Sequence, residues 1–249
     1  YMIINAELKH IRSLHKSKDR LAHRQYIIEG RRLFKEVILT NGPLHLAYYT
    51  DTFQNNFPTM VDDITKMCPT KKITAAEMKT VSATETPSGI LGICIIPDYQ
   101  KSKIKVKENS LFLDNISDPG NMGTLLRTAA WFGINHIFLT GDCVDVYNPK
   151  VVRGGMGAHF NITANVDADI KHFTSTHSIV AADQNGKDLT HLSLSTPWVL
   201  VLGSEAHGIS KNTREHIKHF IAIPRLGSGE SLNVAVAGGV LISKLTSST

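Results

Sequence analysis

The sequence of 249 residues contains little cysteine, and its spacing argues against two common stabilising features. The three cysteines are Cys68, Cys94 and Cys143, and none of them forms a CxxC pair or stands at metal-ligand spacing from a histidine. A disulfide framework and a zinc site are therefore both disfavoured, and we expect the protein to bind no metal. Free thiols fit a reducing compartment.

Long apolar runs are also absent. No stretch approaches the ~20 apolar residues that a helix needs to cross a bilayer. With 42% hydrophobic and 20% charged residues, the composition is equally unlike that of a disordered chain. We therefore expect a soluble, cytoplasmic protein that has no membrane partner.

Two nucleotide-binding fingerprints are missing as well. The glycine-rich segment GSGES at residues 227–231 lacks the lysine of a P-loop, and no GxGxxG follows the first strand expected in either half. These absences disfavour an NTPase and a nucleotide-dependent oxidoreductase.

Positive charge is present in modest excess, and it is concentrated at one end of the chain. The formal net charge is +5, and residues 1–35 hold nine basic residues against three acidic ones. Such a segment fits a polyanionic partner without requiring one. The nine basic residues are Lys9, Arg12, Lys16, Lys18, Arg20, Arg24, Arg31, Arg32 and Lys35.

Residues 1–97 are expected to form a small α/β domain. Apolar residues recur at helical spacing up to Leu14, a basic loop follows, and the YII run at 26–28 predicts a strand. The remaining elements expected in this domain are a helix at 31–40, a strand at 44–50, a helix at 58–67 and a strand at 89–96. Residues 98–109 are polar and charge-rich, which predicts a linker.

Residues 110–249 are expected to form a second α/β domain. Apolar strands alternate with helices, and one glycine-rich turn is predicted between the strands HIFLTG and HSIVAAD. This alternation predicts a mostly parallel sheet covered on both faces. Functional loops of such a sheet lie beyond the carboxyl ends of its strands, and three loops there carry unusual residues.

The first loop, NISDPGNMGTLLR, follows the strand SLFLD. A turn is expected at 118–121, and either Asn121 or Gly123 can begin the next helix. Arg127 then lies about one turn inside that helix. The same pattern is equally typical of an ordinary helix cap with a solvated arginine.

The second loop, GSEAHG at 203–208, ends the strand WVLVLG. Its glycines permit close approach to a ligand, and Glu205 places a carboxylate at the strand end. The third loop runs from Ile223 to Asn233, and Ser231 or Asn233 can cap the last helix and leave amide donors for a ligand. Each glycine loop on its own is a weak signal.

Together and in this order, the three loops strongly resemble the SpoU/TrmH branch of the SPOUT RNA methyltransferases. That branch has N-x-x-D-P-x-N-x-G-x-x-x-R, then G-x-E-x-x-G, then I-P-x-x-G-x-x-x-S-L-N-V-x-x-A, and this chain matches every position. The matching residues are Asn115, Asp118, Pro119, Asn121, Gly123, Arg127, Gly203, Glu205, Gly208, Ile223, Pro224, Gly227, Ser231, Leu232, Asn233, Val234 and Ala237. The segment at 153–158 is similar to the family's R-x-S-x-G-A stretch, with Gly155 where serine is usual.

Residues 7–97 resemble, less specifically, the ribosomal-protein-like substrate-binding domain that often precedes this catalytic domain. The turn at Ile28–Gly30 and the segment Thr86–Ile90 carry that similarity. The resemblance thus implies an RNA substrate-binding domain at 1–97 and a SPOUT methyltransferase domain at 110–249, the latter tied into a trefoil knot.

The resemblance also implies the chemistry and the site. S-adenosyl-L-methionine would donate a methyl group to a ribose 2′-hydroxyl of RNA, with ribosomal RNA favoured over transfer RNA, in a homodimer whose sites are completed across its interface. Gly203, Ile223 and Leu232 would contact the cofactor. The catalytic positions would be Arg127, Asn121, Glu205, Ser231 and Asn233.

Two roles stay open for Arg127, since its guanidinium has a pKa above ~12: a general base, or a group that orients the ribose or a phosphate. The alternative without enzymatic activity is a catalytically silent RNA-binding protein of the same fold.

Overall fold

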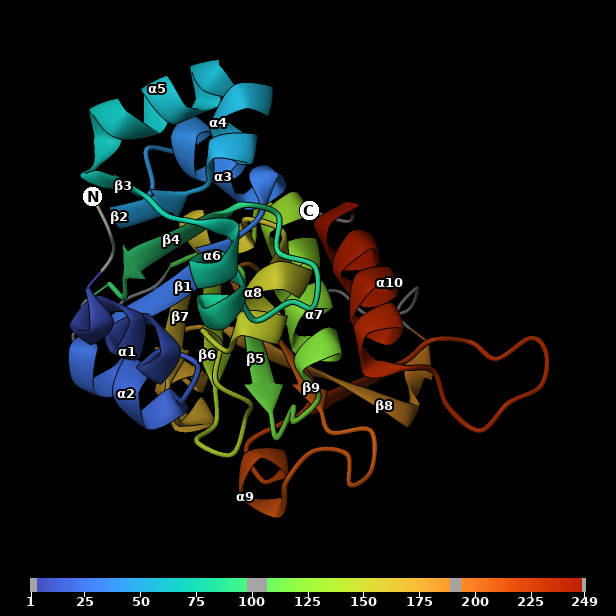
Figure 1. Cartoon of the computed structure of the whole chain (residues 1–249). Coiled ribbons are helices and arrows are strands. Elements are labelled where there is room, and N and C mark those ends of the chain that lie inside the picture. Colours follow the sequence, from blue (N-terminus) through green and yellow to red (C-terminus); the bar gives the residue numbers. More distant parts are fainter. Residues whose placement is uncertain (1–3, 98–106, 189–193, 248–249) are drawn as a thin grey trace. The chain divides into compact units, whose positions relative to one another are not determined.

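The computed structural model describes residues 4–97, 107–188 and 194–247, which belong to two compact units (Figure 1). One unit comprises the chain up to residue 98 together with Asp145–Phe160, and the other comprises residues 99–144 and 161–249. Most of the predicted linker at 98–109 lies outside the described residues.

The first unit contains a four-stranded sheet. Its strands are β1 (Gln25–Glu29), β2 (Leu44–Tyr49), β3 (Thr70–Lys72) and β4 (Ile90–Ile95), and its helices up to residue 81 are α1 (Asn5–Ser13), α2 (Ser17–His23), α3 (Arg31–Leu39), α4 (Asp51–Asn56), α5 (Pro58–Met67) and α6 (Ala75–Val81). The strand order is β1-β4-β2-β3, with β4 antiparallel to both of its neighbours. β4 is buried over its first five residues, which explains why the apolar ILGIC run takes an interior position.

Helices α1 and α6 close a hydrophobic core over this sheet. The apolar face of α1 supplies Ile11, and Leu14 follows at the helix end; both are fully buried. These side chains pack in one cluster with Ile27, Tyr48, Ile73, Met78, Val81, Leu91 and Ile93. The helical spacing predicted near residues 3–14 is therefore confirmed.

The basic loop predicted after α1 is wrong, because residues 17–23 form α2. Arg20 on this helix is only 2% exposed, and its guanidinium donates hydrogen bonds to the Leu14 carbonyl (2.9 Å) and to the Asp145 carboxylate. A buried arginine gives no apolar period, and its partner lies far away in the sequence. For both reasons the sequence pattern suggested a loop.

The single glycine-rich turn predicted between HIFLTG and HSIVAAD is incomplete. A turn is present at Met156 and Gly157, but it follows α8 (Pro149–Gly155) and precedes the short 3-10 helix η1 (Ala158–Phe160). The Asn148 side chain accepts a hydrogen bond from the Lys150 amide (2.9 Å), and Pro149 occupies the first helical position. An Asn-Pro start of this kind is a recognised helix signal, and the nearby glycines masked it.

The segment Asp145–Phe160 is fastened inside the first unit by more than the Arg20–Asp145 pair. Tyr147 packs against Tyr26 of β1 with ring centroids 4.8 Å apart. The His159 ring is 7% exposed and hydrogen-bonds through Nε2 to the Val146 carbonyl (2.8 Å). Burial lowers the pKa of His159 to about 4, so this ring is neutral at physiological pH and costs no buried charge.

The second unit is a six-stranded sheet in which every strand pairing is parallel. Its strands are β5 (Ser110–Asp114), β6 (His136–Leu139), β7 (Thr163–Val166), β8 (Ser178–Asp188), β9 (Trp198–Gly203) and β10 (His219–Ala222), and its helical elements are α7 (Pro119–Trp131), η2 (Ile170–Phe173), α9 (Lys211–Arg214) and α10 (Val234–Ser247). The strand order is β10-β8-β9-β5-β6-β7. The prediction of a parallel α/β sheet is confirmed.

Helices α7 and α10 lie side by side in this unit (Figure 1). Gly238 is buried at their contact: a Cβ built on it would lie 2.6 Å from Leu125 of α7 and 2.8 Å from Leu202 of β9. A Cβ built on the neighbouring Gly239 would have ample room, because the nearest atom that it would meet outside its own helix is a Thr128 methyl carbon at 3.9 Å. The bare backbone at 238 therefore sets how closely α10 approaches α7 and the sheet. Among the described residues, no helix is long and apolar enough to cross a membrane.

These two adjacent glycines provide a matched test of the helix contact. Gly238→Ala should destabilise the protein by about 1–3 kcal/mol, since the new methyl group overpacks a buried contact. Gly239→Ala should be neutral or stabilise it by up to about 1 kcal/mol, because alanine is the better helix former and the site has room. Chemical denaturation of both variants measures the difference, and equal effects would contradict this packing.

Candidate functional site

The three motif loops follow β5, β9 and β10. All three strands belong to the parallel sheet of the second unit, so their carboxyl ends lie at the same edge. The loop after β5 enters α7, and the loop after β10 enters α10. The topology therefore brings residues from three distant parts of the sequence to one edge, as expected from the pattern.

Asn233 connects the three loops through its side chain. Its amide nitrogen donates hydrogen bonds to Asn121 Oδ1 (2.9 Å) and to Glu205 Oε1 (2.6 Å). Its oxygen accepts from the backbone amides of Ala235 (3.0 Å) and Val236 (3.3 Å), which caps α10. One residue thus fixes the helix start and holds the other two loops against it.

Glu205 makes a second contact with the start of α10. The same carboxylate oxygen accepts from the Val234 amide (3.0 Å), another donor of the first helical turn that has no partner within the helix. A carboxylate at this position also interacts favourably with the positive end of the helix dipole. Glu205, Asn121 and Asn233 are therefore confirmed neighbours, and their catalytic roles stay a prediction.

The first loop begins its helix earlier than expected. Asp118 is the N-cap of α7, its carboxylate accepts from the Asn121 amide (2.8 Å), and Pro119 takes the first helical position. Neither Asn121 nor Gly123 starts the helix, because both already lie inside its first turns. This placement directs the Asn121 side chain to Asn233.

The second loop is a tight turn closed by its own backbone. Ser204 and Gly208 exchange two hydrogen bonds, 3.0 Å and 2.8 Å long, and Gly208 has the positive φ of +64° that glycine tolerates. A Cβ at Gly203 would lie 2.4 Å from the Gly208 carbonyl carbon. The missing side chain at 203 is thus needed by the loop itself, whatever ligand it also faces.

Asp114 is a site residue that the sequence reasoning missed. It ends β5 and is only 1% exposed; its Oδ2 accepts from the Ser210 amide (2.7 Å), while its Oδ1 has no hydrogen-bond partner among the described residues. The contact ties the far end of the second loop to β5. A lone carboxylate closing an otherwise apolar strand was the available signal.

The third loop is open to solvent. Arg225 Nη1 donates to the Gly229 carbonyl (2.9 Å), but no main-chain N–H from residue 225 to residue 232 donates a hydrogen bond to any described group. Leu232 is 50% exposed, and Ser231 is exposed too. Ile223, next to the strand end, is partly buried. The loop therefore offers free amide donors beside apolar side chains.

Arg127 does not join the Asn233 network. Its side chain is exposed and makes no hydrogen bond or ion pair with any residue that the structure describes. Six helical positions separate it from Asn121, which turns the two side chains about 120° apart around the helix axis. Nor do three or more His, Cys, Asp or Glu side chains gather at metal-binding distance anywhere in the described ranges.

Comparison with known proteins identifies two family models along the chain. The model of the SpoU rRNA Methylase family matches residues 108–243, and that of the MRM3-like substrate binding domain matches residues 5–92. The 23S rRNA (guanosine(2553)-2′-O)-methyltransferase RlmP of Bacillus subtilis is 28% identical over 97% of this chain and 96% of its own.

Solved structures agree in fold over essentially the whole chain. A TrmH-family protein from Porphyromonas gingivalis superposes with a TM-score of 0.87 at 29% identity, covering 100% of both chains. An rRNA methyltransferase from Sinorhizobium meliloti, solved with AdoMet bound, gives a TM-score of 0.83 at 24% identity, covering 98% of this chain and 96% of its own. At that identity the second likeness shows the fold alone.

The two acceptors at the start of α10 can be separated by amide hydrogen exchange. Glu205→Ala should speed exchange of the Val234 amide by about fivefold or more, since that donor loses its partner, and should leave Ala235 and Val236 protected. Asn233→Ala should do the reverse and cost about 1 kcal/mol of stability through the lost cap. Residue-resolved exchange by NMR measures both. An unchanged Val234 rate in Glu205→Ala would contradict the contact.

Proposed function

The chain belongs to the SpoU rRNA Methylase family, and from this premise we infer that it transfers a methyl group from S-adenosyl-L-methionine to a ribose 2′-hydroxyl of RNA. The observation that carries the inference is the Asn233 network. It joins side chains of all three family motifs, Asn121, Glu205 and Asn233, at the carboxyl edge of the parallel sheet.

Ribosomal RNA is the substrate that the comparisons favour. The Bacillus subtilis relative, which aligns with nearly the whole chain, is named as a methyltransferase of 23S ribosomal RNA. Transfer RNA is the alternative. We place the protein in the cytoplasm, where such a relative would meet bacterial ribosomes.

The third loop fits the methyl donor. Its unpaired main-chain N–H groups and the partly exposed Ile223 and Leu232 together suit an adenine ring, which needs both hydrogen-bond partners at its edge and apolar surface on its faces. We propose that Gly203, Ile223 and Leu232 hold the cofactor. When bound, S-adenosyl-L-methionine supplies a methyl group on a positively charged sulfur, and no metal is required.

The protein's own task is then to place the ribose oxygen in line with that methyl group and to ease loss of its proton. We assign this to Arg127, either as a base in the assembled complex or as a group that orients ribose or phosphate. Asn121, Glu205 and Asn233 hold the surrounding loops in place, and the exposed Ser231 can donate to a phosphate oxygen.

Residues 1–97 would serve as the RNA substrate-binding domain and 110–249 as the methyltransferase domain. Of the nine basic residues in the first 35, Arg20 is excluded from RNA contact by its burial with Asp145, and the other eight are exposed. The sequence suggests deleting residues 1–97 to test their role in RNA binding. This deletion would also remove the residues against which Asp145–Phe160 packs. Point variants are therefore the better probes.

The trefoil knot implied for residues 110–249 stays a prediction.

We further propose a homodimer formed through α7 and α10. Trp131 at the end of α7 is 85% exposed, and Val236 and Val240 of the neighbouring α10 are 53% and 39% exposed. Trp131 lies one turn after Arg127, about 40° away around the axis, so a partner covering this face would also approach Arg127. A site that needs both chains fits the separation of Arg127 from the Asn233 network.

Substitution of Arg127 tests the enzymatic function. Under single-turnover conditions at saturating donor and RNA, Arg127→Ala should lose about 100-fold or more of the transfer rate, because positioning of the reacting oxygen is lost. Donor affinity by calorimetry should be unchanged. Arg127→Lys should be nearly as slow if the planar, forked guanidinium is what matters. Lys218→Ala, which removes an exposed charge elsewhere in this unit, is the control.

The same assay decides the substrate. Labelled methyl groups should appear in unmodified 23S ribosomal RNA rather than in transfer RNA, at linkages that resist alkaline hydrolysis because the 2′-oxygen is blocked. If the protein binds the donor normally but transfers methyl groups to neither RNA, the alternative of a catalytically silent RNA-binding protein is favoured. A near-normal rate in Arg127→Ala would remove Arg127 from the catalytic set.

Replacing Trp131 tests the dimer. Trp131→Glu should convert a dimer into a monomer in light scattering at micromolar concentration, since a charge cannot be buried unpaired in an apolar interface. Leu39→Glu is the control, because Leu39 is an exposed apolar residue of α3 with 69% exposure. A wild-type protein that is monomeric and fully active would refute the proposal.

A further inference from the structure

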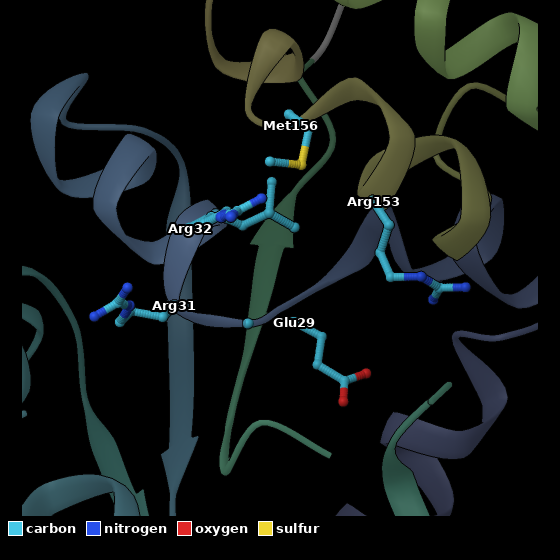
Figure 2. A pocket seen from close by; sticks show the side chains of 7 residues that line it. Glu29, Arg31, Arg32, Arg153 and Met156 are labelled. Carbon is cyan, nitrogen blue, oxygen red and sulfur yellow. The ribbon is translucent and has the colours of Figure 1, made fainter. Parts of the chain in front are cut away.

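A concave pocket of about 350 Å³ lies in the first unit and belongs to none of the motif loops. It is lined by residues 29–33, which span the end of β1 and the start of α3, and by Arg153 and Met156 from the α8 region. Figure 2 shows Arg31 and Arg153 on opposite sides of it. The pocket thus combines residues that match both family models.

Among the described residues, the arginines of this pocket have no acidic partner. Arg32 and Arg153 make no hydrogen bond or ion pair within the described ranges, and Arg31 only stacks on Phe57, 4.9 Å from the ring centroid. The one carboxylate beside them, Glu29, is occupied elsewhere: it accepts hydrogen bonds from the Ser82 hydroxyl, the Ala83 amide (3.2 Å) and the Thr84 hydroxyl (3.0 Å). The pocket therefore carries an excess of positive charge, since three arginines and one carboxylate line it.

The backbone adds to this charge. The N-cap of α3 is Gly30, with φ of +102°, and neither a capping side chain nor an acidic residue is present in the first turn. The helix therefore points unpaired N–H groups, the positive end of its dipole, at the same place. No Cβ shields them at Gly30, where the nearest atom to such a group would be the Ser88 hydroxyl at 3.8 Å.

The helices that carry the positive groups are held in place before any ligand arrives. α8 is fixed by the ion pair of the buried Arg20 with the partly buried Asp145, and by the buried His159 ring. The α3 side is fixed by burial of Leu33 and Phe34 beneath the arginines. Little ordering of the backbone would be required on binding, which favours affinity, although the arginine side chains would still lose rotamer freedom.

We propose that this pocket binds phosphate groups of the RNA backbone, a contact that rests on the RNA substrate inferred above and extends it to a second site. Arginine forks and helix N-terminal amides are both matched to phosphate oxygens. The guanidinium groups lie on opposite sides of an open pocket instead of converging on one point (Figure 2), which suits successive phosphates of a strand better than a single small anion. Contacts of this kind position RNA and do not read its sequence.

The test uses full-length Arg32→Ala and Arg153→Ala. Each should weaken RNA affinity by about fivefold to tenfold. Each should also make the slope of log affinity against log salt shallower by about one, the amount expected for one lost phosphate contact. The loss should be equal for an unmodified 23S ribosomal RNA transcript and for polyuridylate, because the contact ignores sequence. Lys66→Ala on α5, which removes an exposed charge of the same unit outside the pocket, should leave the slope unchanged.

Two further readouts separate this inference from the proposed function. Donor affinity and the single-turnover rate at saturating RNA should stay at wild-type values in both variants, since neither residue belongs to the catalytic set. Wild-type RNA affinity and salt slope in Arg32→Ala and Arg153→Ala, with methyl transfer intact, would overturn the pocket's role and leave the enzyme standing. Failure of the wild-type protein to transfer methyl groups would instead refute the enzyme. Circular dichroism melts confirm that each variant is folded.

Discussion

The side chain of Asn233 is the constraint on which the candidate site depends. A single amide group caps α10 with its oxygen and binds Asn121 and Glu205 with its nitrogen. Neither aspartate nor serine could do both: aspartate has no donor, and serine has one short hydroxyl. The geometry of three loops thus follows from the two-sided chemistry of one carboxamide, placed where parallel strands end at a common edge.

A second constraint operates at Asp145–Phe160. This segment lies within the range of the methylase family model, yet it packs with the first unit through Arg20, Tyr26 and the buried His159. Removing Asp145 would leave the Arg20 guanidinium, which is 2% exposed, without its charged partner, so the association of Arg20 with Asp145 is hard to exchange for a solvated state. The family's Arg153 is consequently carried on a helix whose position is set by residues of the first 35.

What the sequence allowed us to predict follows from the nature of each signal. Apolar runs identified β5 and β9, and apolar residues at helical spacing identified α3, because burial on a sheet or a helix face leaves a local trace. The motif loops were placed correctly because parallel strands end at one edge. By contrast, α2 depends on a buried arginine whose partner is Asp145, and the closeness of Gly203 to Gly208 depends on the turn between them. Such contacts join residues through the fold and leave no local pattern. Asp114 is intermediate: its place in the sequence is unusual, but only the structure supplies the Ser210 amide that it holds.

The position of Arg127 explains why helix α7 would need a partner for catalysis. Side chains on one helix that are six positions apart point about 120° from each other, so α7 cannot direct both Asn121 and Arg127 toward the Asn233 network. Asn121 is already bound there, which leaves Arg127 on the face that also presents Trp131. A solvent-exposed arginine side chain does not hold one fixed orientation by itself, because hydration and side-chain entropy oppose any ordered contact. We therefore expect a second surface, whether RNA or another copy of the chain, to approach this face and hold the guanidinium in one orientation. In the proposed assembly, apolar burial of Trp131 against such a surface would supply free energy for that ordering and would couple assembly of the site to its chemistry.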